Sequence, residues 1–420
     1  MRRYFGTDGV RGIVGEDLTA DLVERLGRAA TLWSGRGRIF IGRDTRASGV
    51  ELEGALAHGI ASAGGNAVVA GVLPTPAVAL LTLDLGCVIT ASHNPPEYNG
   101  VKFFDRNGQK LTDEQEEQIE ALLDAPGTGG GEIDEVGVAT DSYLEHVLER
   151  FGSDLSGLHI GVDSANGAYA GLAPTAFEQL GAKVETIGND PDGTNINVEC
   201  GATDLRALQA LVTREGLDLG VAFDGDGDRM LAVDANGDVV DGDTIVAILA
   251  LNLGVESVTV TPMTNLGFHE LMSEHGIQTY TTDEVGDRYV LETMRANGGK
   301  LGGEQSGHII YLDGHVTGDG LVGALALCRA LRGRSLAEAA AVMPRHPQVK
   351  ENVRVRSKIL TESLVQTVSA ANAELSGRGR VLVRPSGTEP VVRVLAEARD
   401  REEAANLCAT IAALVRRELG

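Results

Sequence analysis

Residues 219–229 read LGVAFDGDGDR, an apolar run followed directly by three aspartates at alternate positions. The run 219–223 has the length and composition of a strand that is buried on both faces. Asp224, Asp226 and Asp228 would then lie at the carboxyl end of that strand, where ligands collect in open α/β sheets. Three carboxylates repel one another unless a cation lies among them, so this stretch predicts a site for Mg²⁺, Mn²⁺ or Ca²⁺.

Three alternative roles for these aspartates fit the sequence less well. An isolated D-G-D run is often only a solvated turn, but its position after a buried strand favours the metal site. A calcium loop would need glycine where Arg229 stands and glutamate where Ala235 stands. A nucleophile of the haloacid-dehalogenase type would need Thr or Val in place of Asp228. The metal site therefore remains the preferred interpretation.

Short apolar segments alternate with amphipathic helical patterns on both sides of this stretch. Segments 38–42, 66–72 and 87–91 have the composition of strands, and 48–63 has the spacing of a helix that stops at paired glycines. Strands that alternate with helices predict parallel sheets flanked by helices. We therefore expect an α/β fold class, with three similar domains built on mixed or parallel sheets.

Turn signals and composition divide the chain into four expected domains. The glycine-rich segment 125–131 is the clearest linker, because glycine-rich turns resist both helix and strand. After residue 345 the pattern is strand, helix, strand, strand and helix, which is typical of an α+β module, and Lys and Arg outnumber Asp and Glu there. The expected domains are 1–138, 139–241, 242–345 and 346–420.

Composition limits the partners and the location that we expect. The chain of 420 residues carries a formal charge of −24 and only 4% aromatic residues, so we expect no nucleic-acid partner. Its four cysteines are scattered with no CxxC pair, which argues against a disulfide framework or a thiolate zinc site. Neither a signal peptide nor an apolar run of about 18 residues is present, so we expect a cytoplasmic protein without a membrane partner.

Two further stretches offer hydroxyl groups beside apolar segments. Residues 90–96, TASHNPP, follow the strand expected at 87–91, so Ser92 is a candidate nucleophile or phosphate carrier. A plain turn or N-cap serine is the alternative. Residues 384–390, RPSGTEP, with Arg393 beyond them, combine arginine, hydroxyl groups and glycine in a way that suits an anion. An ordinary hairpin loop flanked by prolines is the alternative there.

Weaker candidates come from a glycine-rich loop and from the arginines near the amino terminus. Residues 302–308, GGEQSGH, would let a loop present polar side chains to a hydroxyl-rich ligand, although a solvent loop accounts for them equally well. Arg11, Arg43 and Arg46 would together gather phosphate, whereas each alone is more typical of a surface or salt-bridge arginine.

The four loop sequences resemble the signature loops of the α-D-phosphohexomutase superfamily. TASHNP, DGDGDR, GGEQSGH and RPSGTEP occur in the order expected for that superfamily, and the resemblance covers nearly the full length. The opening YFGTDGVRG and Gln305 resemble its bacterial phosphoglucosamine mutase branch. The segment 95–100, PPEYNG, also looks like forms in phosphomannomutase/phosphoglucomutase relatives, which are the alternative assignment.

The resemblance implies a fold and a reaction. Four domains would surround a central cleft, each contributing one loop. A phosphoserine would donate its phosphoryl group to the substrate, give a bound 1,6-bisphosphate and take the other phosphate back. Glucosamine 6-phosphate and glucosamine 1-phosphate would interconvert in this way, supplying UDP-N-acetylglucosamine synthesis. Hexosamine or glucose 1,6-bisphosphate would act as the activator. The phosphosugar substrate would be the binding partner, and the chain would form a homodimer.

The resemblance also implies roles for individual residues. Ser92 would carry the phosphoryl group and, with Asp224, Asp226 and Asp228, would hold one Mg²⁺. The remaining implied roles are proton transfer or charge stabilisation by Lys102, Arg11 and His93, sugar binding by Glu304, Ser306, His308 and Arg229, and binding of the phosphate that is not transferred by Arg384, Ser386, Gly387, Thr388 and Arg393.

Overall fold

The computed structural model describes residues 3–6, 8–386 and 390–420. The chain forms two compact units, Met1–Met263 with Ile277–Val342, and Thr264–Gly276 with Met343–Gly420. The described residues contain four sheets, three in the first unit and one in the second. Within these same ranges, no helix combines the length and the apolar character that crossing a membrane requires.

The first sheet has parallel strands at its centre and antiparallel strands on one side. β2 pairs in parallel with β3 and with β4, whereas β5 pairs antiparallel with β4 and with β1. The sheet is therefore mixed, and the carboxyl end of β4 turns directly into the loop that returns as β5. The strand order is β1 (Val10–Ile13), β5 (Tyr98–Asp105), β4 (Leu85–Ile89), β2 (Arg38–Arg43), β3 (Asn66–Val72) and β6 (Ile133–Glu135).

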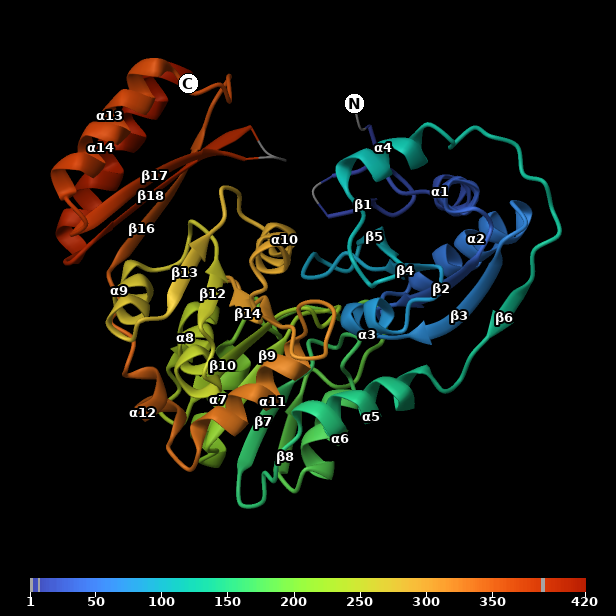
Figure 1. The fold of residues 1–420 in the computed structure, drawn as a ribbon, viewed down its shortest axis with the longest axis horizontal. Helices are drawn as coiled ribbons and strands as arrows, with labels where there is room; N and C mark the ends of the chain where they lie inside the picture. The colour runs from blue at the N-terminus through green and yellow to red at the C-terminus, as the bar shows by residue number, and fades with distance from the viewer. Residues whose placement is uncertain (1–2, 7, 387–389) are drawn as a thin grey trace. The chain divides into compact units, whose positions relative to one another are not determined.

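Helix α2 (Gly49–Ser62) packs on this sheet, and α1 (Ala20–Ser34) lies alongside α2 (Figure 1). α1 begins at Thr19, whose side chain accepts a hydrogen bond from the backbone of the first turn. The two helices can approach closely because Gly59 has no side chain: a Cβ there would lie 1.9 Å from a backbone oxygen of α1. The shorter helices of this region are α3 (Thr75–Leu80) and α4 (Asp113–Glu120).

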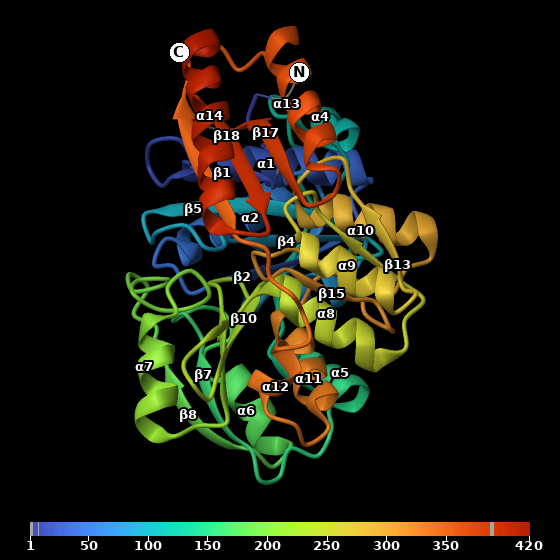
Figure 2. The ribbon, with the colours of Figure 1, turned by 90° about the vertical axis from the view of Figure 1, so that its left-hand side faces the viewer.

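The second sheet carries residues 219–223 on a central strand. β9 (Leu219–Phe223) is buried at every position, as its apolar sequence predicts, and pairs in parallel with β7 (His159–Asp163). β10 (Met230–Asp234) returns antiparallel to β9, so the turn between them holds the aspartates. Figure 2 shows α6 and α7 beside β7 and β8. The other elements are β8 (Lys183–Ile187), β11 (Val239–Val240), α5 (Ala139–Phe151), α6 (Leu172–Gln179) and α7 (Arg206–Glu215).

The third sheet has the order β13-β12-β14-β15. β12 pairs in parallel with β13 and β14, and β15 returns antiparallel to β14. Two helices of this region, α8 (Gly242–Leu253) and α11 (Gly320–Leu331), contact each other and are buried over most of their length, which explains why they are apolar all round. The remaining bounds are β12 (Ser257–Val260), β13 (Gln278–Thr281), β14 (Leu301–Gly303), β15 (Ile309–Tyr311), α10 (Asp287–Asn297) and α12 (Leu336–Ala340).

The second unit is an antiparallel sheet covered by two helices. β18 (Val391–Ala398) lies between β16 (Gln348–Arg354) and β17 (Gly379–Pro385), and α13 (Glu362–Leu375) and α14 (Arg401–Leu419) pack on the sheet (Figure 1). α9 (Leu266–Glu274) belongs to this unit. The fully buried carboxylate of Glu397 fixes α9, because it accepts hydrogen bonds from the backbone N–H of Leu266 at 2.8 Å and from Arg380 Nε at 2.7 Å.

The fold class predicted from the sequence is confirmed, since mixed sheets with helices are followed by a C-terminal α+β module. The strand expected at 66–72 is β3, and the helix expected at 48–63 is α2, shorter by one residue at each end. β6 was not predicted. It pairs in parallel with β3 although all three of its residues are exposed, so its sequence contains no apolar alternation that would mark a strand.

Candidate active site

The loop after β4 presents Ser92 to the turn after β9. Ser92 is buried and has a φ of 52°, in the left-handed region that few residues other than glycine adopt. Its Oγ donates a hydrogen bond to Asp224 Oδ2 at 2.7 Å, across 132 positions of sequence. Behind it, Ser92 N–H donates to Thr90 Oγ1 at 2.8 Å, and Thr90 Oγ1 donates to Asp44 Oδ2 at 2.6 Å. The predicted nucleophile and the first predicted metal ligand are therefore in direct contact.

The three aspartates form one buried cluster. Asp224, Asp226 and Asp228 each offer an oxygen, and these oxygens all lie within 4.8 Å of one another. Asp226 Oδ1 and Asp228 Oδ1 are buried and accept no hydrogen bond from the described residues. Burial, and then the charges of Asp228 and Asp226, raise the pKa of Asp224 well above its usual range. Oxygen donors with unused lone pairs, converging in a buried site, fit a hard divalent cation such as Mg²⁺.

Lys102, from β5, and Thr75, from the first turn of α3, reach the cluster from the other side. Lys102 Nζ lies 3.1 Å from Asp226 Oδ2 and 3.1 Å from Asp8 Oδ2, and Thr75 Oγ1 donates to Asp226 Oδ2 at 2.8 Å. Burial alone would lower the pKa of Lys102, but the charges of Asp226 and Asp8 outweigh it and raise that pKa. Lys102 is therefore a charged ammonium in this arrangement.

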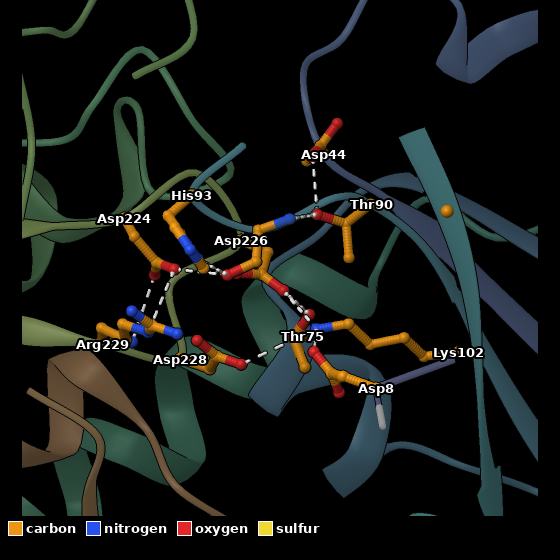
Figure 3. Close-up of polar contacts among 12 residues, drawn as sticks. Asp8, Asp44, Thr75, Thr90, His93, Lys102, Asp224, Asp226, Asp228 and Arg229 are labelled. Atoms are coloured by element: carbon orange, nitrogen blue, oxygen red, sulfur yellow. Dashed lines mark hydrogen bonds and ion pairs between the residues drawn. The ribbon is translucent and has the colours of Figure 1, made fainter. Parts of the chain in front are cut away.

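Three predicted residues, Arg229, Lys102 and His93, lie around the aspartate cluster (Figure 3). Figure 3 shows Arg229 and Lys102 approaching the aspartates from opposite sides. His93 Nδ1 lies 3.4 Å from Ser92 Oγ. Burial, and then the positive charges of Arg229 and Arg11, lower the pKa of His93 to about 3, so its imidazole is neutral near pH 7. Arg11 itself is paired with Asp8.

The loop between β14 and β15 joins this site through a histidine. Arg229 Nε donates to His308 Nε2 at 3.0 Å, and His308 Nδ1 lies 3.2 Å from the backbone oxygen of Asp228. Glu304 Oε2 lies 3.9 Å from His308 Nε2 and 3.5 Å from Ser306 Oγ. Burial raises the pKa of Glu304, although His308 opposes the shift. All four predicted sugar-binding residues therefore lie within one connected group.

The predicted anion-binding residues lie in the second unit. Arg384 and Arg393 face each other on β17 and β18, and Arg393 Nη2 donates to Ser386 Oγ at 3.5 Å. Lys358 Nζ donates to the backbone oxygen of Ser386 at 2.9 Å, which brings a further cation that the sequence did not indicate. Gly387 and Thr388, also predicted here, lie outside the described residues.

Several polar residues at the site had not been identified from the sequence. Thr75, Asp8 and Asn197 come from three segments, of which only that of Asp8, YFGTDGVRG, was quoted from the sequence, and there without a role for Asp8. Lys110 pairs with Asp8 at 2.9 Å and with Asp287 at 2.8 Å, linking the first and third sheets. The P-T-P sequence around Thr75, which follows the strand predicted at 66–72, was a second usable signal.

Family models match almost the whole chain. Those of phosphoglucomutase/phosphomannomutase α/β/α domains I, II and III match residues 2–128, 141–237 and 241–346, and that of the C-terminal domain matches residues 338–414. A crystal structure of a phosphoglucomutase/phosphomannomutase family protein from Burkholderia thailandensis superposes with a TM-score of 0.86 and 26% identity, covering 99% of this chain and 98% of that one.

Full-length relatives are more similar in sequence. The phosphoglucosamine mutase of Moorella thermoacetica is 49% identical over 97% of this chain and 98% of its own, and that of Thermobifida fusca is 49% identical over 100% and 99%. The Aspergillus fumigatus N-acetylphosphoglucosamine mutase, crystallised with GlcNAc-6P and magnesium, shares the fold with a TM-score of 0.71 at 19% identity, covering 99% and 96%. The chain therefore belongs to the phosphoglucomutase/phosphomannomutase family of the α-D-phosphohexomutase superfamily.

Proposed function

We propose that this protein interconverts glucosamine 6-phosphate and glucosamine 1-phosphate, with Ser92 as the phosphoryl carrier. The observation that carries the proposal is the 2.7 Å contact between Ser92 Oγ and Asp224, one of three buried carboxylates with converging oxygens. The full-length similarity to phosphoglucosamine mutases supports the amino sugar over glucose or mannose. The chain is then an isomerase that works by phosphoryl transfer.

In the proposed reaction, the P–O bond of phosphoserine 92 breaks as one sugar oxygen forms a new bond to phosphorus. The sugar hydroxyl gives up its proton and Ser92 Oγ, released from phosphorus, takes one up, so the products are a bound 1,6-bisphosphate and a free serine hydroxyl. After the intermediate turns around, Ser92 Oγ attacks the other phosphoryl group. The Ser92 hydroxyl already donates to Asp224 Oδ2, so its proton has an acceptor in place when that attack begins.

Ser92, Asp224, Asp226 and Asp228 would hold one Mg²⁺ in this proposal. Once bound, the ion would offset the charge on the phosphoryl oxygens. Lys102 would act chiefly as a fixed positive charge, because its raised pKa keeps it protonated near neutral pH. Arg11 would add charge from the same side, while His93 would remain neutral and offer Nδ1 near the serine.

The remaining groups would bind the substrate. Glu304 and Ser306 present carboxylate and hydroxyl oxygens that suit sugar hydroxyls. The hydrogen bond between His308 and Arg229 joins the loop of Glu304 and Ser306 to residues 224–229, the metal loop. In the second unit, Arg384, Ser386, Gly387, Thr388 and Arg393 would bind the phosphate that is not transferred. Four domains at 1–138, 139–241, 242–345 and 346–420, a homodimer, a bisphosphate activator and a cytoplasmic location complete the proposal.

Initial rates on glucosamine, glucose and mannose phosphates test the substrate. We expect the highest kcat/KM on glucosamine 6-phosphate, with isomer formation and little release of inorganic phosphate. A large preference for glucose 1-phosphate would favour the phosphomannomutase/phosphoglucomutase alternative. Steady phosphate release without isomer would instead indicate a metal-dependent phosphatase. Intact mass with a phosphopeptide map would report whether Ser92 carries the phosphoryl group.

A further inference from the structure

Arg46 is completely buried, and each hydrogen-bond donor of its side chain is used. The sequence favoured a surface or salt-bridge role, or a phosphate ligand in company with Arg11 and Arg43, but its guanidinium has no exposure to solvent. Nε donates to Asp44 Oδ2 at 2.9 Å. The four terminal N–H groups donate to backbone oxygens, namely those of Ser92 at 3.0 Å, Asn94 at 2.8 Å, Tyr98 at 2.9 Å and Pro95. Five donors meet five acceptors, so no N–H remains for a phosphate.

Three of these backbone acceptors belong to the loop that carries Ser92, and the fourth, Tyr98, is the first residue of β5, where that loop ends. The backbone between Ser92 and Tyr98 therefore curls around one guanidinium, with four carbonyl groups directed inward. Asp44 fixes Arg46 in turn, since it also accepts Arg46 N–H at 3.0 Å and the hydroxyl of Thr90 at 2.6 Å. A planar group with donors in a fixed fork determines both the position and the direction of these carbonyls.

A second donor reaches the same carbonyls from the second sheet's region of the chain. Asn197 Nδ2 donates to the backbone oxygens of Ser92 at 2.9 Å and of Asn94 at 3.3 Å. A Cβ at Gly225 would lie 2.7 Å from the Ser92 oxygen and 2.8 Å from Asn197 Nδ2, so the metal loop is in direct contact with both. The left-handed φ of Ser92 is thus held from two sides, next to the aspartates.

We propose that Arg46 is a positioning residue for phosphoryl transfer, which holds the Ser92 loop so that Oγ points at the metal loop and not at bulk water. This inference rests on the proposed function and adds a consequence to it. A phosphoserine held in one direction transfers its group to a sugar hydroxyl in preference to water. The reason is that the direction from which an oxygen can attack phosphorus, in line with the bond to Ser92 Oγ, is then fixed. Loosening the loop should lower transfer and leave sugar binding in place.

Arg46→Lys tests this proposal, with Arg43→Lys as the matched control. Lysine keeps the charge but offers three donors in place of five and lacks the fork. Arg43 lies three residues away, pairs with Glu53 at 3.1 Å and donates to no carbonyl of the Ser92 loop among the described contacts. For Arg46→Lys we expect kcat to fall by about 10²-fold with KM changed by less than about threefold. We expect Arg43→Lys to stay within about threefold of the wild type.

Three further measurements separate positioning from folding. The fraction of phosphoenzyme that loses inorganic phosphate to water, with ³²P-labelled protein, should rise in Arg46→Lys. Hydrogen exchange in peptides that cover residues 90–98 should quicken, while exchange in α1 and α2 stays unchanged. Asn197→Ala, which removes the second donor to the carbonyls of Ser92 and Asn94, should show the same changes with about a tenfold or smaller loss of kcat. This variant tests the proposal if Arg46→Lys does not fold.

The outcomes distinguish this inference from the proposed function. An active wild type whose Arg46→Lys and Asn197→Ala variants keep kcat and the hydrolysed fraction would overturn the positioning role and leave the function intact. A wild type without mutase activity would overturn the function. Faster exchange at residues 90–98 in the variants would then still support the role of Arg46 and Asn197 in holding the Ser92 loop, and unchanged exchange would overturn that role as well.

Discussion

The Ser92 loop and the metal loop lie against each other, but their polar atoms are satisfied in opposite ways. In the Ser92 loop, the carbonyls of Ser92 and Asn94 each accept two hydrogen bonds, from Arg46 and from Asn197. In the metal loop, Asp226 Oδ1 and Asp228 Oδ1 are buried and accept none from the described residues. These carbonyls of the Ser92 loop are hydrogen-bonded within the protein, whereas the metal loop keeps two buried oxygens that are free to bind a ligand.

This difference indicates which part of the site is preformed. A loop that has four carbonyls bonded to one buried guanidinium has one low-energy arrangement, because any other would leave a buried donor or carbonyl unpaired. Three buried carboxylates repel one another until a cation joins them. The protein therefore fixes the nucleophile by itself, whereas Lys102, which Asp226 shares with Asp8, offsets only part of the charge of the neighbouring loop and leaves two carboxylate oxygens for a bound ion.

Ser92→Ala should have the largest effect on turnover. It removes the phosphoryl acceptor, so we expect a loss of activity on the order of 10⁴-fold or more. Stability should change by only about 1 kcal/mol, because Oγ makes a single short hydrogen bond, to Asp224. Coupled assays and urea denaturation measure the two effects. Activity within tenfold of the wild type would remove Ser92 from the mechanism.

Asp226→Asn should weaken the metal loop while the Ser92 loop stays intact. We expect Mg²⁺ affinity to fall by about 10²-fold, since an anionic ligand becomes neutral and Lys102 loses one of the two carboxylates that lie 3.1 Å from it. Mn²⁺ binding followed by electron paramagnetic resonance gives the affinity directly. Asp238→Asn, at the exposed β10–β11 turn, is the control and should bind as the wild type does. Equal affinity in both variants would contradict the assignment of Asp226 as a ligand.

Removing the metal tests the comparison between the two loops most directly. A cation at 100 times its Kd stabilises the folded state by about 2.7 kcal/mol, so EDTA should lower the Tm measurably. Hydrogen exchange around residues 224–229 should quicken when the ion is removed, whereas exchange around residues 90–98 should change little. Equal quickening of both segments would show that the Ser92 loop is not preformed.

The sequence predicted the parts of this site that are local in the chain. Asp224, Asp226 and Asp228 are neighbours after an apolar strand, so their convergence follows from the position of β9 alone. The burial of Arg46 depends on carbonyls that come together only when the loop after β4 closes, and no spacing pattern records that. Asn197 lies 105 positions from Ser92, and the chain between them shows no pairing signal.

The smallest effect concerns the protonation of His93, beside the Ser92 loop. Its pKa is about 3 in the fold, below the ordinary value of 6.5, because burial and then Arg229 and Arg11 disfavour the charged ring. The unfolded chain therefore binds the proton more readily, so the contribution of neutral His93 to stability is complete above about pH 6.5 and is lost as the pH falls toward 3.

Unfolding free energies of the metal-free, dephosphorylated protein at pH 7 and pH 5 measure this contribution. We expect His93→Gln to lose on the order of 1 kcal/mol less than the wild type on acidification, after allowance for solvent screening. His58→Gln, which replaces an exposed histidine of α2, is the control and should follow the wild type. An imidazole of His93 that titrates near pH 6.5 in NMR spectra would show that the two arginines and burial do not control it, and the loop would then be open to water.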